Sequence, residues 1–334
     1  MLKRIINKLR RDLPNISRWA KKKLFPLWFL NNWTSKIFIK LYNQSSFNYK
    51  EYLLREYIEK NETAWIPREF TFIVNFNKKN ISVPVRAESF GSDMGLAFCL
   101  LGLDAPVKNV YHFVFNSLKA DHNLYILDIG ANFGQNLILF CSQTENVTAF
   151  EPNTSCYPEL NRILQVNGYK PKILKKAIGE APSRITLRWP KGCSWMGTID
   201  GTAHLEALGY RDFDEEVIDV VTLDDEFSEY DQKLLLIKID VEGHELASFK
   251  GGRNLLIKND CLILFEHDHS RAKGRQEIWG FLKSIGYDLC SLSLCSRDPV
   301  SPLHTLEQYI NDPMPNHCAV KKTSTFREFL LLNA

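Results

Sequence analysis

The sequence predicts an α/β fold in which helices cover both faces of a mostly parallel, twisted sheet. Two observations support it. A strand–turn–helix–strand pattern begins at Leu124 and ends at Glu151, and strand and helix patterns continue to alternate after it. At 334 residues, 45% of them hydrophobic and 24% charged, the chain has the composition of a globular protein that buries a sizeable core. We therefore expect one large domain with an N-terminal extension.

The turn of this first unit carries Asp128, Gly130, Asn132 and Gly134, and its second strand ends in Glu151. A Rossmann-like unit of this layout binds a mononucleotide at the carboxyl ends of its strands. A Cβ at Gly130 would collide with whatever lies over the turn. The carboxylate of Glu151 could accept hydrogen bonds from both hydroxyls of a ribose. The pattern therefore predicts a cofactor that contains adenosine.

The composition of the turn favours one adenosine compound over another. A dinucleotide turn has the pattern Gly-x-Gly-x-x-Gly, whereas here Asn132 replaces the second glycine and Asp128 precedes the turn. A carboxylate repels a pyrophosphate but attracts the ammonium and sulfonium of S-adenosylmethionine. Two alternatives stay open: a nicotinamide-dependent oxidoreductase, and an ordinary βα turn that happens to contain glycines.

Two later buried strands end in acids and histidines. The first of these strands is followed by Asp240, Glu242, His244 and Glu245, and the second by Glu266, His267, Asp268 and His269. Adjacent strand ends with such side chains suit proton abstraction, although a lone histidine after a strand is more often structural. These residue types also bind divalent ions, but no segment places three ligands at a recognised spacing, so we expect no metal.

The N-terminal segment is strongly basic. Residues 1–40 contain many Lys and Arg and the single acid Asp12. Within this segment, Leu24–Trp33 is an apolar, aromatic stretch. This stretch is too short to span a bilayer, but a basic amphipathic helix next to it suits an anionic membrane surface. A helical subdomain with a solvated basic face and an organellar targeting segment are the alternatives. No RNP-like or zinc-knuckle pattern accompanies the charge, so nucleic acid is not an expected partner.

The eight cysteines contain no Cys-x-x-Cys pair, which favours a reducing, cytoplasmic location, with the N-terminus as a candidate contact at the inner membrane face. We divide the chain into an extension (1–68), a hairpin and helices (69–120) and a cofactor-binding domain (121–334) with a substrate-binding insertion near 184–224. The smaller elements that the pattern predicts are strands at Phe70–Phe76 and Ile81–Arg86 around a turn at Asn77–Asn80, helices at Asp93–Leu103 and Val107–Leu118, and strands at Lys172–Ile178, Ile185–Trp189 and Val217–Val221.

Five segments of the chain form a recognisable set: Leu127–Gly134, Ala149–Asn153, Ala177–Gly179, Thr222–Asp225 and Ile237–Glu245. In order and spacing they resemble the FkbM family of S-adenosylmethionine-dependent methyltransferases over roughly residues 121–281. The resemblance implies a class I methyltransferase sheet and, usually, O-methylation of a hydroxyl on a sugar, polyketide or related metabolite. A methyltransferase-like scaffold without activity is the alternative.

The resemblance also implies roles for individual residues. Asp240 and Glu242 fall in the most characteristic segment of the family, and we hypothesise that Asp240 or His267 is the general base while Glu242 and His244 hold the acceptor or orient the site. By the same resemblance, the methionine end of the cofactor lies against Asp128, Gly130, Asn132 and Gly134, the ribose against Glu151, and the adenine near Ala177 and Ile178.

Overall fold

The computed structural model describes residues 69–86, 105–118, 123–194, 196–199, 201–207, 209–267, 272–293 and 298–331. The basic N-terminal segment and the helix expected at Asp93–Leu103 lie outside them. The chain divides into two compact units, residues 1–72 with 83–103 and residues 73–82 with 104–334. The large sheet and the candidate site belong to the second unit. No helix in the described ranges is long and apolar enough to cross a membrane.

The second unit is built on an eight-stranded sheet of order β12-β11-β13-β10-β9-β3-β4-β5. From β5 to β10 all neighbouring strands are parallel, and β13 runs antiparallel to both β10 and β11. The strand bounds are β3 Leu124–Ile129, β4 Val147–Phe150, β5 Lys172–Leu174, β9 Leu234–Ile239, β10 Asp260–Glu266, β11 Tyr287–Leu292, β12 Val300–Leu303 and β13 Asn316–Lys321.

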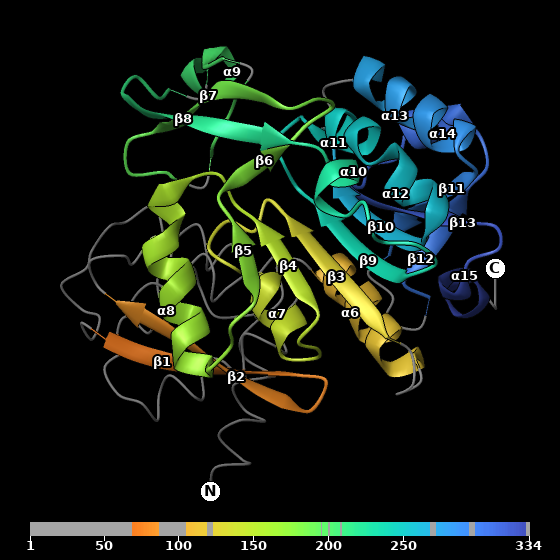
Figure 1. The fold of residues 1–334 in the computed structure, drawn as a ribbon, viewed down its shortest axis with the longest axis horizontal. Helices are drawn as coiled ribbons and strands as arrows, with labels where there is room; N and C mark the ends of the chain where they lie inside the picture. The colour runs from red at the N-terminus through yellow and green to blue at the C-terminus, as the bar shows by residue number, and fades with distance from the viewer. Residues whose placement is uncertain are drawn as a thin grey trace, which may run out of the picture. The chain divides into compact units, whose positions relative to one another are not determined.

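The chain order of the strands reverses at β3, because β4 and β5 follow on one side of it and β9 and β10 on the other (Figure 1). Such a reversal opens a crevice beyond the carboxyl ends of the strands. Alternate residues of β3, β9 and β10, such as Ile129, Ile237 and Ile263, join the main hydrophobic core, which also holds Phe249 and Leu282 of the covering helices. The predicted Rossmann-like sheet is confirmed.

Helices lie on both faces of this sheet: in Figure 1, α6 lies behind β3 and α12 in front of β9. The helix predicted at Val107–Leu118 is confirmed as α6. The helical bounds are α6 Ala105–Ser117, α7 Leu137–Cys141, η5 Thr154–Cys156, α8 Tyr157–Asn167, α9 Ala203–Ala207, α10 Leu223–Glu226, α11 Glu245–Gly251, α12 Arg253–Lys258, α13 Ala272–Ser284, α14 Leu306–Ile310 and α15 Thr325–Leu330.

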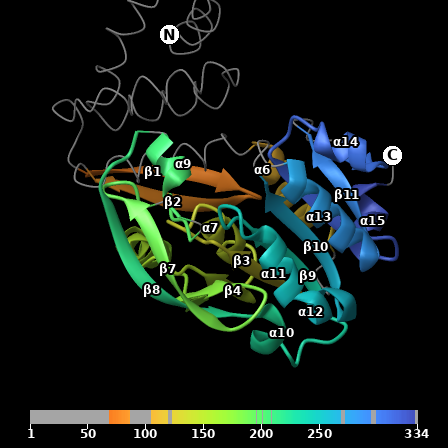
Figure 2. The same ribbon diagram turned by 90° about the horizontal axis from the view of Figure 1, so that it is seen from above.

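The third predicted strand is divided between two sheets. Residues Lys172–Leu174 form β5 of the main sheet, whereas Lys176–Ile178 form β6, which pairs with β8 (Phe213–Val221). With β7 (Ser183–Pro190), these strands make a three-stranded sheet of order β6-β8-β7 next to β4 (Figure 2). The single strand was a wrong prediction, because the partner that draws β6 away lies some forty residues later in the chain.

The predicted insertion near 184–224 therefore folds as a second sheet, and the strands expected in it are confirmed. Leu187 and Trp189 of β7 and Ile218 of β8 form its own small hydrophobic cluster. The backbone of Gly179, just after β6, touches α11: a Cβ on Gly251 would lie 1.9 Å from the carbonyl oxygen of Gly179. Glycine at 251 thus lets the end of β6 pack against α11.

The predicted hairpin is formed by β1 (Glu69–Phe76) and β2 (Lys79–Arg86). Its turn has two residues instead of the four expected at Asn77–Asn80. Asn77 and Lys78 have φ of 45° and 65°, as a tight hairpin turn whose twist matches the strands requires. Asparagine tolerates this left-handed region, so a two-residue turn is possible and β2 begins two residues earlier than the run of polar residues indicates.

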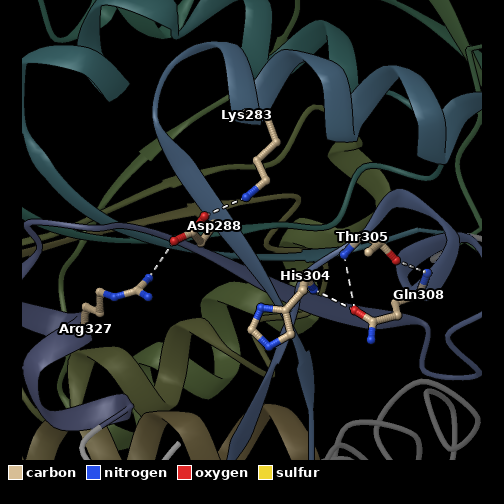
Figure 3. A network of polar contacts seen from close by, with 6 residues as sticks. All are labelled: Lys283, Asp288, His304, Thr305, Gln308 and Arg327. Atoms are coloured by element: carbon tan, nitrogen blue, oxygen red, sulfur yellow. Dashed lines mark hydrogen bonds and ion pairs between the residues drawn. The ribbon is translucent and has the colours of Figure 1, made fainter.

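The C-terminal elements are joined by a polar network (Figure 3). Asp288 of β11 accepts hydrogen bonds from Lys283 of α13 at 2.6 Å and from Arg327 of α15 at 2.8 Å. Thr305 and Gln308 bond reciprocally at the start of α14, a capping box that satisfies its first backbone N–H groups. The network holds α13 and α15 against the same strand.

Candidate active site

The turn after β3 is shaped by a close backbone approach. Gly130 has φ of +84°, and its N–H and that of Ala131 both donate to the carbonyl oxygen of Phe150 on β4. A Cβ at Gly130 would lie 1.9 Å from the carbonyl oxygen of Asp240. What lies over this glycine is therefore the chain leaving β9. Gly134, with φ of +90°, makes a similar approach to Leu160 of α8.

Asn132 and Glu151 are tied together. Asn132 has φ of +50°, a region that asparagine adopts more readily than most side chains, so it can stand where a dinucleotide turn has glycine. Its N–H donates to Oε2 of Glu151 at 2.7 Å, and the N–H of Asn153 donates to Oε1 at 2.7 Å. Each carboxylate oxygen keeps one more acceptor position. Burial raises the pKa of Glu151 to about 7 against the effect of these two bonds.

Asp128 is a buried carboxylate beside a buried ammonium. Its side chain is 1% exposed, and within the described residues its Oδ2 has no hydrogen-bond partner. Lys238 of β9 lies opposite Asp128 in the parallel pair and is 2% exposed. Burial raises the pKa of Asp128 to about 7, although the charge of Lys238 opposes this shift.

Lys238 was not among the predicted site residues. A lysine inside the apolar strand Leu234–Ile239 was the available sequence signal, because a buried lysine needs an acidic partner. Its Nζ lies 3.3 Å from Oδ2 of Asp240. The ammonium of Lys238 therefore lies between the strand end that carries Asp128 and the one that carries Asp240.

Asp240 and Glu242 lie where β9 ends. The N–H of Asp240 donates to the carbonyl of Ile129 at 2.9 Å, and its side chain is 27% exposed. Glu242 is exposed to solvent and has φ of +52°, an uncommon backbone conformation for glutamate. Desolvation by the surrounding protein and the charges of Asp240 and Glu266 raise its pKa to about 8. Carboxylates therefore gather where β9 and β10 end.

The two histidines of the prediction have different surroundings. His244 is half-buried and precedes α11, where its side chain makes no capping bond to the helix. His267 is 5% exposed, and its Nδ1 lies 3.6 Å from Oε2 of Glu245, a residue that sequence reasoning did not select. Among the described residues, no group of three or more His, Cys, Asp or Glu side chains could hold a metal ion.

Residues 128–289 match the family model of the methyltransferase FkbM domain. The chain contains an FkbM methyltransferase domain. The match begins at Asp128 and ends within β11, so it includes every carboxylate described above. Comparison with curated proteins found no match.

Three of the solved structures that are similar to this chain are methyltransferases. One is FkbM from Methylobacillus flagellatus KT, with 18% identity, a TM-score of 0.39 and coverage of 70% of this chain and 54% of that one, so this chain spans about half of its length. The plantazolicin methyltransferase BpumL in complex with SAH has 11% identity, a TM-score of 0.36 and coverage of 81% and 98%. The Pyrococcus abyssi tRNA (uracil-54, C5)-methyltransferase has 11% identity, a TM-score of 0.37 and coverage of 76% and 44%.

The two residues predicted near adenine lie in the sheet of the insertion. Ile178 belongs to the main core of the FkbM domain, and its carbonyl accepts a bond from Ser248 of α11 at 3.4 Å. Ala177 packs against the small cluster of the second sheet. Their side chains thus face protein, and a contact with adenine stays a prediction.

The insertion contacts the segment that follows Glu151. The side-chain amide of Asn153, two residues after Glu151, donates to the carbonyl of Ser194 at 2.7 Å. Thr154 donates to Glu216 of β8 at 2.6 Å. The loop between β7 and β8 is therefore anchored next to Glu151, a place from which it can contact a ligand.

Proposed function

We propose that the protein transfers a methyl group from S-adenosylmethionine to a hydroxyl of a sugar, glycan or related metabolite. The observation that carries the proposal is the pair of buried carboxylates, Asp128 and Glu151, at adjacent strand ends inside the FkbM domain. The match to this domain supports methyl transfer, and the carboxylates support the choice of cofactor.

The residues present fit S-adenosylmethionine better than a dinucleotide. The unpartnered Oδ2 of Asp128 suits an ammonium group, since charge-assisted bonds are the strong ones in a buried site. Glu151 is fixed by two backbone bonds and retains acceptor positions for two ribose hydroxyls. A pyrophosphate would meet like charge from both residues. When bound, S-adenosylmethionine supplies an electrophilic methyl group on sulfur.

Asp240 is the base in this proposal. It lies at the end of β9, its side chain is 27% exposed, and the ammonium of Lys238 lies 3.3 Å from its Oδ2. The acceptor oxygen forms the new bond to carbon while Asp240 accepts the hydroxyl proton, and the bonding electrons of the old bond stay on sulfur. A positioned base of this kind contributes about 10²–10⁴-fold to the rate.

Glu242 and His244 flank this base and are proposed to hold the acceptor. Both follow Asp240 within four residues, and the side chain of Glu242 is exposed. Carboxylates accept hydrogen bonds from neighbouring hydroxyls of a sugar but repel phosphate and carboxylate groups. A neutral polyhydroxylated acceptor therefore suits the mouth of the crevice better than an anionic one.

The test uses S-adenosylmethionine with an isotopically labelled methyl group and a panel of neutral glycans and hydroxylated metabolites. We expect label on an oxygen of the acceptor with the wild-type protein. Asp240→Asn should lower transfer at least 100-fold and still bind cofactor. Label on nitrogen or carbon would contradict the proposal, and so would full activity of Asp240→Asn.

A further inference from the structure

A buried carboxylate and imidazole lie behind the proposed base. Glu245 begins α11 and His267 follows β10, and their side chains are 3% and 5% exposed. Oε2 of Glu245 lies 3.6 Å from Nδ1 of His267. Within the described residues neither nitrogen of the ring has a partner at hydrogen-bond distance. Among the described residues, Glu245 is the charged partner of this buried histidine.

The other oxygen of Glu245 holds the turn that carries the acidic residues. Oε1 accepts bonds from the N–H of Gly243 at 3.1 Å and of Val241 at 3.4 Å. Glu242, between them, has the left-handed φ of +52°, a strained conformation for glutamate that persists only where neighbouring structure enforces it. Glu245 supplies that enforcement from within the same segment.

Residues 241–243 are also linked to the proposed cofactor site, through Asp240. The carbonyl of Asp240 lies so close to Gly130 that a Cβ there would be 1.9 Å away. A shift of residues 241–243 would therefore move Asp240 against the glycine turn. The chain of contacts runs from His267 through Glu245 to the turn and then to Gly130.

The backbone of His267 is bonded to a second segment, because its backbone N–H donates to the carbonyl of Pro315 at 2.9 Å. The residues before Pro315 are held by the buried guanidinium of Arg275, which donates to the carbonyls of Tyr309, Asp312 and Met314 at 2.7–3.2 Å. The side chain of His267 is only 5% exposed, so its ring is poorly placed to reach an acceptor hydroxyl.

We propose that Glu245 and His267 form a positioning pair, which holds the turn 241–243 and through it Asp240 and Glu242, and that His267 does not take the proton of the acceptor. The positioning of Asp240 matters only if the proposed methyl transfer is correct, whereas the pair and its hold on the turn do not depend on it. Burial would raise the pKa of Glu245, but the neighbouring His267 and the backbone N–H groups that bond the carboxylate outweigh this and lower the pKa below its usual value. The carboxylate is therefore ionised at neutral pH.

The first test needs no ligand. We expect ¹⁵N NMR to show that Nδ1 of His267 carries a proton in the wild type. Glu245→Gln should alter the tautomer, and it should also speed hydrogen exchange of the Gly243 amide at least tenfold. An unchanged tautomer and unchanged exchange at Gly243 would overturn the pair, whether or not the protein is a methyltransferase.

The second test measures the affinity for S-adenosylhomocysteine by calorimetry. Asp312→Asn is the matched control, because it alters a second buried carboxylate–histidine pair. In that pair, Oδ2 of Asp312 lies 3.3 Å from Nε2 of His317, and Oδ1 of Asp312 accepts a bond from the backbone N–H of Met314. Glu245→Gln should weaken binding at least tenfold, Asp312→Asn less than twofold. Equal losses in the two variants would mean a general effect on folding and would overturn the positioning role.

His267→Gln separates positioning from catalysis, since glutamine keeps a donor for Glu245. We expect it to restore most of the affinity and amide protection that His267→Phe loses. If His267→Gln bound S-adenosylhomocysteine normally but abolished transfer in the labelled-methyl assay, His267 would be the base and the proposal would be wrong. If the wild type bound no S-adenosylhomocysteine, the proposed function would fail while the NMR test still decided on the pair.

Discussion

Charge balance is the main theme at the scale of single residues. Asp128, Asp240 and Glu242 all interact electrostatically with the ammonium of Lys238. Lys238 and Arg275 are the buried cations of the described residues, and the guanidinium of Arg275 bonds backbone carbonyls elsewhere. Lys238 therefore carries most of the positive charge that makes a buried acidic crevice tolerable.

Replacing Lys238 with methionine should destabilise the protein strongly. Removing one partner of a buried ion pair leaves an uncompensated charge and costs about 3–5 kcal/mol. We expect this loss in urea unfolding at pH 7, and a smaller loss at pH 5, where the raised pKa of Asp128 leaves it mostly protonated. Lys250→Met is the control, because its pair with Glu180 is exposed. Similar losses for both variants would contradict the account.

The affinity for S-adenosylmethionine should rise with pH between 6 and 8. Burial raises the pKa of both Asp128 and Glu151 to about 7, so below this pH these two carboxyl groups are largely uncharged. A cation binds the ionised form better, and its binding releases protons. Calorimetry in buffers of different ionisation enthalpy measures this release. Asp128→Asn should flatten the profile, and a wild-type affinity independent of pH would disprove the role of these carboxylates.

At the scale of elements, the sequence predicted those structures whose causes are local. β3, β4, β9 and β10 are short apolar runs that end in glycine or acids, and α6 shows helical spacing. The division of the third strand into β5 and β6 depends on β8, and the pairing of His267 with Glu245 depends on two strand ends meeting in space. Neither can be inferred from neighbouring residues, so the sequence placed His267 among the candidate bases without its partner.

Asp288 should stabilise the C-terminal elements in a pH-dependent way. Burial opposes its ionisation, but Lys283 and Arg327 outweigh this and lower the pKa of Asp288 below its usual value. The stabilisation is then present above the pKa of the unfolded state and lost as the pH falls through the lower folded-state pKa. Asp288→Asn should cost about 1 kcal/mol at pH 7, because the three side chains are partly exposed.

Urea unfolding at pH 7 and pH 3 measures the contribution of Asp288. Glu277→Gln is a suitable control, since Glu277 lies 3.9 Å from an almost fully exposed Lys273 and its loss should be within 0.5 kcal/mol, roughly the limit for surface changes. An Asp288→Asn loss that was as large at pH 3 as at pH 7 would show that charge is not the cause.

At the scale of the whole molecule, the reversal of strand order at β3 brings together residues that are far apart in the chain. Asp128, Glu151 and Asp240 lie at the ends of three strands, and the charge of Asp240 adds to the rise that burial causes in the pKa of Asp128 and of Glu151. Their types and strand-end positions were predictable, because parallel strands present their carboxyl ends at one edge. Lys238 and Glu245 were not selected, because a side chain's burial and partners depend on packing that no spacing rule contains.

The basic N-terminal segment leads to a prediction for the entire chain. Residues 1–40 lie outside the described residues, and their Lys and Arg content with the aromatic stretch Leu24–Trp33 favours contact with an anionic membrane surface. We expect the full chain to co-sediment with phosphatidylserine vesicles and to be released by added salt. Deletion of residues 1–40 should abolish co-sedimentation, and unchanged binding of the truncated protein would contradict the prediction.

The central claim is that the carboxylate-lined crevice of the FkbM domain takes S-adenosylmethionine as its cofactor. Parallel calorimetric titrations with S-adenosylmethionine, S-adenosylhomocysteine and NAD test it most directly. We predict micromolar binding of the two adenosyl compounds and no binding of NAD, with a large loss for both ligands in Glu151→Ala. Binding of NAD alone, or of none of the three, would contradict the claim.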